Sequence, residues 1–298
     1  MNIPSFFKNP HILLTLGAVA ISFSGVWVEI ADVPADSSAF YRVFFGFLFL
    51  LVISLHFRTK IIPRREHLLL GILCGVLFAL DLFCWHRSIL LIGPGLATIL
   101  GNFQVFILAG IGVFLLQEKY SGFLLLAIPL AVAGLFLIIG FDERQIQENY
   151  VLGIYYGLAT AVLYASYILS LKQLSSRCSE TYQPMLLASF FTAVVLGLAV
   201  FFTDTSFVIP TVTSFFSLLS LGFFSQCLGW LLIASSLPKT DTSKAGLILL
   251  LQPALSFVWD VIFFQRPTGL VNWVGVVVTL TAIYIGLRSK RQSFTANR

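Results

Sequence analysis

Charged residues are scarce in this chain of 298 residues. Only 10% of the residues are Asp, Glu, Lys or Arg, whereas 58% are hydrophobic and the mean hydropathy is +0.95. A soluble domain of this length needs many more charges to cover its surface, so this composition excludes a soluble protein. The formal net charge of +5 comes without a basic stripe interleaved with aromatic residues, which argues against nucleic-acid binding.

Cysteine and histidine are also sparse, with four residues of each. The cysteines form no close-spaced metal motif, and three of them lie inside apolar stretches, so we interpret them as packing residues. The histidines are scattered, and the sequence contains no Walker A motif and no catalytic constellation. We therefore expect no bound metal, no cofactor and no enzymatic activity.

Long apolar stretches, in contrast, fill most of the chain. Ten of them approach the roughly 20 residues that an α-helix needs to cross about 30 Å of hydrocarbon. Lipid cannot satisfy an open backbone, so each stretch is expected to be helical. The sequence predicts an all-α integral membrane protein with spans at residues 11–30, 38–57, 66–89, 94–117, 120–140, 150–171, 183–203, 211–236, 244–264 and 268–287.

The loops between these spans alternate in charge. With the N-terminus in the cytoplasm, the inner loops and termini hold most of the basic residues: Lys8, Arg58, Lys60, Arg64, Arg65, Lys119, Lys172, Arg177, Lys239, Lys244, Arg288, Lys290, Arg291 and Arg298. The outer loops hold Arg144 and Arg266 together with the acidic residues Asp32, Asp36, Asp142, Glu143, Glu148 and Asp204. The positive-inside rule therefore predicts that both termini are cytoplasmic.

Ten spans divide into two halves of five, residues 1–141 and 142–298. Because five is odd, the second half enters the membrane from the opposite side, as in the inverted repeats of secondary transporters. Two short segments in corresponding spans support the repeat: Asp81-Leu-Phe-Cys-Trp85 and Gln226-Cys-Leu-Gly-Trp230. Each places a polar side chain and a Trp four residues apart, on one helix face.

Two glutamines also correspond between the halves. Gln104 and Gln252 are separated by 148 residues, as are Ala97 and Ala245. A rise of about 1.5 Å per residue places both glutamines near the membrane midplane, where inverted-repeat transporters bind substrate. The alternative is that each glutamine only bonds to a neighbouring helix.

In its whole length the chain resembles the EamA-type ten-helix branch of the drug/metabolite transporter superfamily. The resemblance is carried by Val26-Trp27-Val28-Glu29 and Pro34, by Ala39-Phe40-Tyr41-Arg42, by Gln117-Glu118, and by Gln252-Pro253-Ala254 with Gly275. Two positions depart from the family pattern. Val105 replaces a helix-breaking proline in the fourth span, and Arg266 is the second-half counterpart of Glu118.

Ionisable side chains inside spans are costly and are functional candidates by default. Five are expected in the outer half of the membrane, as an ion-pair network around an outer vestibule: Glu29, Arg42, Asp81, Arg87 and Asp260. The arginines could instead extend to the outer interface, and Glu29 could face only the outer loop. Asp81 is either a proton-coupling or substrate-binding group, or one member of a static ion pair.

Aromatic residues are the other candidates for a binding site. Trp85, Tyr164, Tyr167 and Trp230, together with Gln226, are expected to line a cavity near the midplane. Such a lining suits a flat, cationic or apolar metabolite through stacking or cation–π contact. An ordinary interfacial belt is an equal alternative for Trp85 and Trp27.

Transport follows as the expected function. The resemblance implies a secondary transporter in a bacterial inner membrane that exports amino acids or related metabolites by alternating access. Import of a scavenged nutrient or cofactor, facilitated or proton-coupled, is the main alternative, and a channel or an intramembrane enzyme is a minor one. The substrate, the coupling ion and the choice between monomer and homodimer stay open at this stage.

Overall fold

The computed structural model describes residues 9–57, 65–118, 122–139, 149–203 and 205–288, with the backbone alone at residues 93–96. Its regular elements are all helical. They are α1 (Pro10–Ser22), α2 (Ser24–Ala31), α3 (Ala35–His56), α4 (Arg65–Asn102), α5 (Gln104–Gly110), η2 (Ile111–Leu115), α6 (Gly122–Ile139), α7 (Tyr150–Arg177), α8 (Gln183–Phe202), α9 (Val212–Ser220), η4 (Leu221–Gly229), α10 (Trp230–Ser236), η5 (Leu237–Lys239), α11 (Thr242–Leu249), α12 (Leu251–Phe264) and α13 (Leu270–Arg288).

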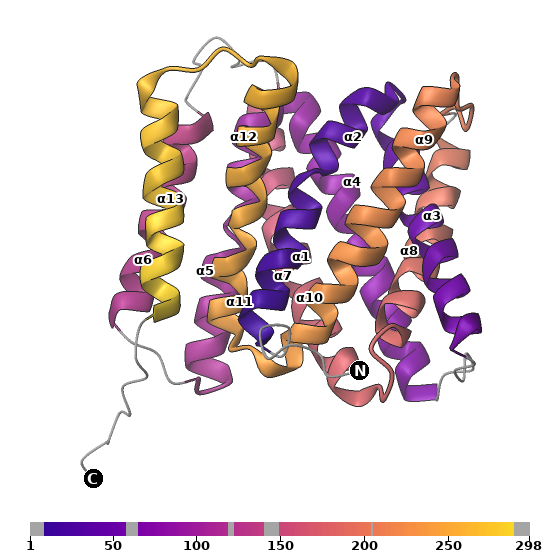
Figure 1. Ribbon diagram of the computed structural model, residues 1–298, viewed down its shortest axis with the longest axis horizontal. Helices are drawn as coiled ribbons and strands as arrows, with labels where there is room; N and C mark the ends of the chain where they lie inside the picture. Colours follow the sequence, from indigo (N-terminus) through magenta and orange to yellow (C-terminus); the bar gives the residue numbers. More distant parts are fainter. Residues whose placement is uncertain (1–8, 58–64, 119–121, 140–148, 204, 289–298) are drawn as a thin grey trace.

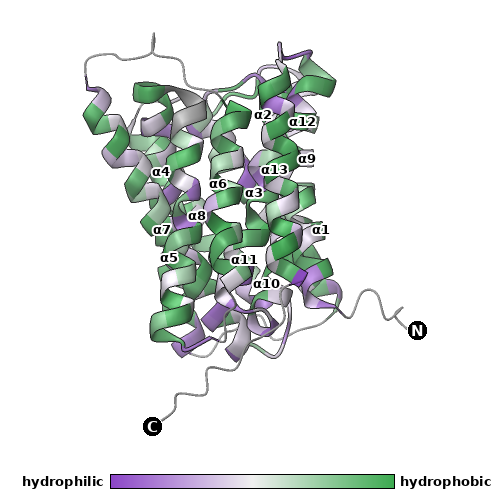
Figure 2. Cartoon of the chain, turned by 90° about the vertical axis from the view of Figure 1, so that its left-hand side faces the viewer, coloured by the Kyte–Doolittle hydropathy of each residue, from purple (hydrophilic) through white to green (hydrophobic). Residues whose placement is uncertain are grey.

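These helices form ten spans in the described part of the chain, which confirms the predicted all-α membrane architecture. The largest disagreement in bounds is at the end of the sixth span, predicted at residue 171 and found at Arg177. The helices stand side by side in one bundle (Figure 1), and hydrophobic residues dominate their middle sections (Figure 2). We call the face where α1 begins and α13 ends the lower face, and the face where α12 ends the upper face (Figure 1).

The predicted loop between the third and fourth spans is a helical bend. Backbone assigned to α4 continues from Arg65 to Asn102, yet Gly101 lies against Trp85, and Gly157 lies against both Leu100 and Ser88. The two arms of α4 therefore run back along each other. The bend coincides with Gly93-Pro94-Gly95, a sequence in which proline and glycine favour a sharp change of direction.

The inverted repeat is visible in the way the fourth and ninth spans end. Gln117 and Gln265, 148 residues apart, both adopt left-handed backbone, with φ of 50° and 52°. In each case the next amide bonds to a carbonyl six residues earlier: Glu118 N to Gly112 O at 2.8 Å, and Arg266 N to Asp260 O at 3.4 Å. Left-handed C-caps of this kind satisfy carbonyls that a helix end leaves free.

The two halves interlock rather than sit apart. In the first span, α1 packs against the second half, where a Cβ at Gly17 would lie 2.7 Å from Gly229 O. The Trp259 indole donates to Ser22 Oγ at 2.8 Å, and its ring stacks on Phe23 at 4.2 Å. The predicted boundary between residues 141 and 142 lies outside the described residues.

Candidate functional site

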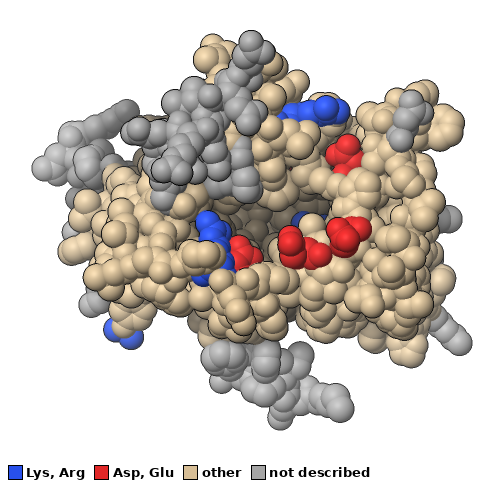
Figure 3. All heavy atoms as spheres, turned by 90° about the horizontal axis from the view of Figure 1, so that it is seen from above, with Lys and Arg blue, Asp and Glu red and all other residues tan. Residues whose placement is uncertain are grey.

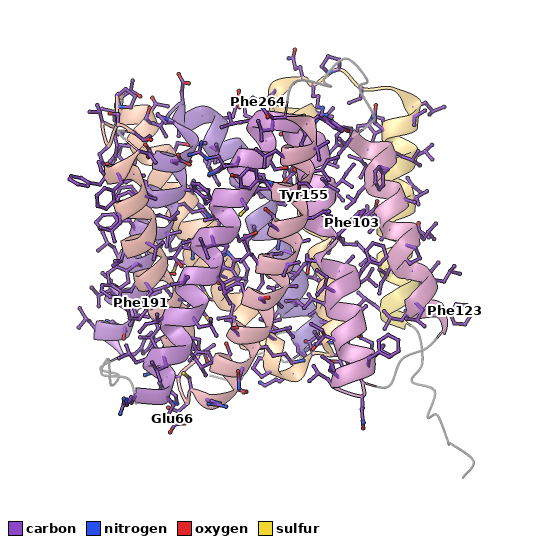
Figure 4. All side chains as sticks on the ribbon, turned by 180° about the vertical axis from the view of Figure 1, so that it is seen from behind. Glu66, Phe103, Phe123, Tyr155, Phe191 and Phe264 are labelled. Atoms are coloured by element: carbon purple, nitrogen blue, oxygen red, sulfur yellow. The ribbon has the colours of Figure 1, made fainter. Side chains whose placement is uncertain are left out.

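The fourth and ninth spans are both interrupted inside the bundle. The fourth breaks at Phe103, between α4 and α5, and the ninth at Leu250, between α11 and α12. At each break the backbone forms a 3₁₀-type turn. Phe103 N donates to Leu100 O at 3.0 Å, and Leu250 N donates to Leu247 O at 3.2 Å. Figure 4 places Phe103 well inside the height of the bundle, with Glu66 at its lower edge and Phe264 at its upper edge.

The breaks place the two predicted glutamines at corresponding positions. Gln104 is the first residue of α5 and Gln252 the second residue of α12. The break in the fourth span forms although Val105 stands where the family has a proline. Asn102 compensates part of the interrupted ladder, because its side-chain amide donates to Thr98 O at 2.8 Å. Interrupted helices of this kind form substrate sites in secondary transporters.

A cluster of aromatic side chains lies beside the ninth span. Phe78 of α4 stacks on Tyr167 of α7 with ring centroids 4.5 Å apart, and the Trp230 ring of α10 meets Tyr167 at 5.0 Å. Tyr164 lies 6.2 Å from Trp230 and adjoins Gln252. The structure therefore brings Tyr164, Tyr167, Trp230 and Gln252 together, as the sequence predicted.

A buried pair of opposite charges adjoins this cluster. Arg42 of α3 interacts electrostatically with Asp81 of α4 and with the hydroxyl groups of Tyr164 and Tyr167. The Asp81 residue is only 6% exposed, and the Arg42 Nε atom is shielded from solvent. Arg42 therefore does not extend to the interface but faces the interior, where an isolated charge would be costly.

Several buried polar atoms of these residues lack a hydrogen-bond partner within the described protein. They are Arg42 Nε, Asp81 Oδ1, Gln104 Nε2 and Oε1, Tyr167 OH, Trp230 Nε1 and Gln252 Nε2. Each such atom costs about 1–3 kcal/mol when it stays unsatisfied. The unpaired atoms of Arg42, Asp81, Tyr167, Trp230 and Gln252 belong to the aromatic cluster and its adjoining charges, and they are therefore suited to a polar ligand that supplies the partners.

Two further predicted site residues, Gln226 and Trp85, make contacts with neighbouring helical segments. Gln226 of η4 donates to Ser189 Oγ of α8 at 3.1 Å and packs on Gly46 of α3, so it links three helices. Trp85 packs at Gly101, on the inner side of the α4 bend. Neither contact involves Asp81 or Arg42.

The upper face carries the remaining predicted charges. Figure 3 shows a hollow in this face with acidic side chains around it. Asp260 pairs with Arg266 at 3.5 Å and lies within electrostatic range of Glu29. Arg87 lies over the Phe83 ring at 4.9 Å. The described interactions thus divide the predicted charges into the buried Arg42–Asp81 pair, the Asp260 group and Arg87, instead of the single network that we expected.

Glu118 makes a contact that the sequence did not predict. On the lower face its Oε1 accepts from Thr242 N at 2.5 Å, and its Oε2 accepts from Ser243 N at 3.1 Å and Ser243 Oγ at 2.9 Å. Lys172 Nζ lies 3.7 Å from the same carboxylate. Negative charge at a helix N-terminus is stabilising, so Glu118 holds the end of the fourth span against the start of the ninth.

Among the described residues, no three His, Cys, Asp or Glu side chains gather closely enough to hold a metal ion. The polar atoms of the cluster are a charge pair, amides, a phenol and an indole, which suit an organic solute better than a metal.

Comparisons with known proteins agree with this geometry. A curated protein of Escherichia coli (strain K12), "Probable amino-acid metabolite efflux pump", is 25% identical over 240 residues, which cover 76% of this chain and 79% of that protein. A crystal structure at 13% identity shares the fold with a TM-score of 0.80 over 94% of this chain and 98% of its own. The model of the EamA-like transporter family matches residues 9–140 and 151–288, so the chain belongs to that family.

Proposed function

We propose that this protein is a secondary transporter that exports amino acids or related small metabolites by alternating access. The observation that carries the proposal is the set of buried, unpaired polar atoms beside the interrupted ninth span. A fully satisfied core would make a stable bundle, whereas unpaired donors and acceptors destabilise the protein until a solute bonds to them.

The chemistry of the cluster suits a zwitterion. The Arg42 guanidinium matches a carboxylate, and Asp81 matches an ammonium group. The aromatic faces of Tyr164, Tyr167 and Trp230 offer stacking to an apolar or aromatic side chain. The E. coli relative is named for amino-acid metabolite efflux, which supports the same substrate class.

In an alternating-access cycle, the arrangement described here would be one of the two states. Glu118 joins the two halves at the lower face, and the hollow in Figure 3 opens on the upper face. Transport then requires that the lower contact breaks while the upper face closes. Residues 1–141 and 142–298 are the two units whose relative movement would exchange these states.

The orientation of the protein in the membrane is inferred from the position of its basic residues. Lys172, Arg177, Lys239 and Arg288 belong to the lower half of their helices, so the positive-inside rule assigns the lower face and both termini to the cytoplasm. The open face is then the outer face of a bacterial inner membrane, and the solute leaves from the state described here.

Proton coupling is the role that we propose for Asp81. It is the buried carboxylate of the cluster, and its Oδ1 atom has no partner in the described protein. A carboxylate that releases a solute ammonium group can accept a proton in its place, so binding and protonation would compete at one atom.

A liposome assay tests the function and this role together. Purified protein is reconstituted with a pH-sensitive dye inside, and zwitterionic amino acids are added to wild type and to Asp81→Asn. We expect solute-dependent proton movement in wild type and a loss of at least about tenfold in the variant, whose exchange of labelled solute persists only at higher solute concentration because Asn offers no charge to the ammonium group. Glu66→Gln is the matched control, because this exposed carboxylate of α4 lies far from the cluster at the lower edge.

Other outcomes of the assay would support a different function. Solute flux without proton movement, equal in both proteins, would leave a facilitator and reduce Asp81 to a structural ion pair. Uptake from the upper side that exceeds export under every gradient would favour the importer. Flux that never saturates would indicate a channel, and a chemically altered product would indicate an enzyme.

A further inference from the structure

The lower contact between Glu118 and Lys172 joins residues from opposite halves. Glu118 follows the fourth span in the first half, and Lys172 lies in the last turns of α7, the first helix of the second half. Lys172 also donates to Thr240 O and Thr242 Oγ1, both at 2.8 Å. The two side chains meet where the start of α11 closes the lower face.

The inverted repeat defines which residues should meet at the upper face. Arg266 follows Glu118 by 148 residues, and the two share the same backbone geometry after a left-handed glutamine. With the same offset of 148 residues, the position that corresponds to Lys172 is Ser24, the first residue of α2. Glu29, later in the same helix, is the acidic residue of the first span nearest to this position. The charges at the two ends of the molecule are therefore reversed.

Asp260 explains why Arg266 is not paired with Glu29 in this state. Its first-half counterpart is Gly112, where a Cβ would lie only 2.5 Å from Glu118 Oε2. Asp260 places a carboxylate in the corresponding space and holds the Arg266 guanidinium 3.5 Å from Oδ2. Both side chains stay accessible, with 42% of Arg266 and 37% of Asp260 exposed.

Glu29 belongs to α2, which packs against α12 beside this pair. It is exposed and within electrostatic range of Asp260. Gly25, one helical turn earlier on the same face of α2, has a Cβ position 4.0 Å from Asp260 Oδ1. A small approach of α2 and α12 therefore brings Glu29 to Arg266.

We propose that Arg266 moves from Asp260 to Glu29 when the upper face closes, and that this ion pair is the charge-reversed counterpart of Lys172–Glu118. The proposal rests on the alternating access proposed above. Glu29 and Arg266 are positioning residues of the transport cycle, because they touch each other and not the solute. Asp260 retains Arg266 while the upper face is open.

A cysteine reporter in the upper opening tests this exchange. The full-length protein carries Gly25→Cys, with the four native cysteines replaced, and is placed in lipid nanodiscs with a bulky neutral maleimide. Glu118→Gln removes one charge of the lower contact and shifts the protein toward the upper-closed state. We expect it to slow labelling of the introduced thiol by about threefold, since accessible ion pairs change populations about twofold to fivefold.

The charges at the upper face are then reversed one at a time and together. Glu29→Arg or Arg266→Glu alone should abolish the slowing caused by Glu118→Gln, and the double reversal should restore it. As the matched control, the Glu66–Arg177 pair, 3.9 Å apart at the lower surface, is reversed in the same way and should change nothing. Monodisperse gel filtration of each protein shows that the variants fold.

The outcomes separate the two proposals. If Glu118→Gln leaves labelling unchanged in every background, alternating access fails and the Glu29–Arg266 pair fails with it. If labelling slows but single reversals have no effect, or the double reversal does not restore the slowing, alternating access stands and the pair is refuted. Restoration by the double reversal alone supports the pair.

Discussion

At the scale of single residues, the burial of Arg42 and Asp81 destabilises the fold but places two charged groups where a solute could bind. The two groups are held in the bundle interior although Arg42 Nε and Asp81 Oδ1 both lack a hydrogen-bond partner in the described protein. Breaking a buried pair leaves an uncompensated charge, which costs more than removing both charges. The pair should therefore show strong coupling in a double-mutant cycle.

We expect Arg42→Gln alone to lower the free energy of unfolding by about 1–3 kcal/mol, because Asp81 stays buried while it loses a nearby positive charge. Arg42→Gln combined with Asp81→Asn should cost less than the single substitution. Denaturant unfolding in detergent micelles, followed by tryptophan fluorescence, measures both. Additive losses would mean that the two side chains do not act as a pair.

Cys178 provides a residue-scale prediction outside the spans. Its thiol lies 3.8 Å from His67 Nδ1, and burial raises the pKa of Cys178 to about 11. Because the thiolate is the reactive form, alkylation at pH 8 should be about two hundred times slower than for a free thiol of pKa about 8.5. The rate of Cys178 modification, followed by mass spectrometry, should rise about tenfold per pH unit toward pH 11. A plateau near pH 9 would contradict the buried environment.

At the scale of helices, close approach of α6 and α13 depends on paired glycines. A Cβ at Gly275 would lie 2.6 Å from Gly134 O and from Ile138 N, so backbone meets backbone. Thr279 adds a bond to Ala131 O at 3.3 Å across the same contact. Small residues allow such packing between membrane helices.

Gly275→Ala should therefore lower the free energy of unfolding by about 1–3 kcal/mol, because the added methyl group forces the helices apart. Gly110→Ala is the matched control, since a Cβ there meets nothing within 4 Å. It should be neutral or slightly stabilising. Thermal unfolding of both variants in the same detergent measures the difference in stability. Equal melting temperatures would refute the close contact.

The helical elements also show what sequence can and cannot predict. Hydropathy predicted all ten spans, because length and apolar content alone decide whether a helix can cross a membrane. It missed the helical bend of α4, where Gly93-Pro94-Gly95 reads as an ordinary loop. The break at Phe103 has no proline to mark it, so the sequence did not predict it.

At the scale of the whole molecule, the sequence predicted some members of the candidate site and missed a contact between residues far apart in the chain. Aromatic side-chain chemistry suggested Tyr164, Tyr167 and Trp230 as site residues, and the structure places them beside Gln252. Gln226 stays a predicted member of the site: its Nε2 donates to Ser189 Oγ, and its buried Oε1 has no partner in the described protein. Glu118 joins residues more than 120 positions later, a contact that no local pattern contains.

The same architecture makes the two faces unequal in the state described. One face is joined by Glu118 across the halves, while the other is hollowed and bordered by acidic side chains (Figure 3). A carrier must exchange these two arrangements around a single site, which is the central claim of our proposal.

Counterflow is the most direct measurement of that claim. Proteoliposomes are loaded with an unlabelled zwitterionic amino acid at high concentration and diluted into a trace of the labelled compound. A carrier with one alternately exposed site should accumulate label transiently above its equilibrium level. Label that only rises to equilibrium, without an overshoot for any amino acid tested, would contradict transport of this class by alternating access.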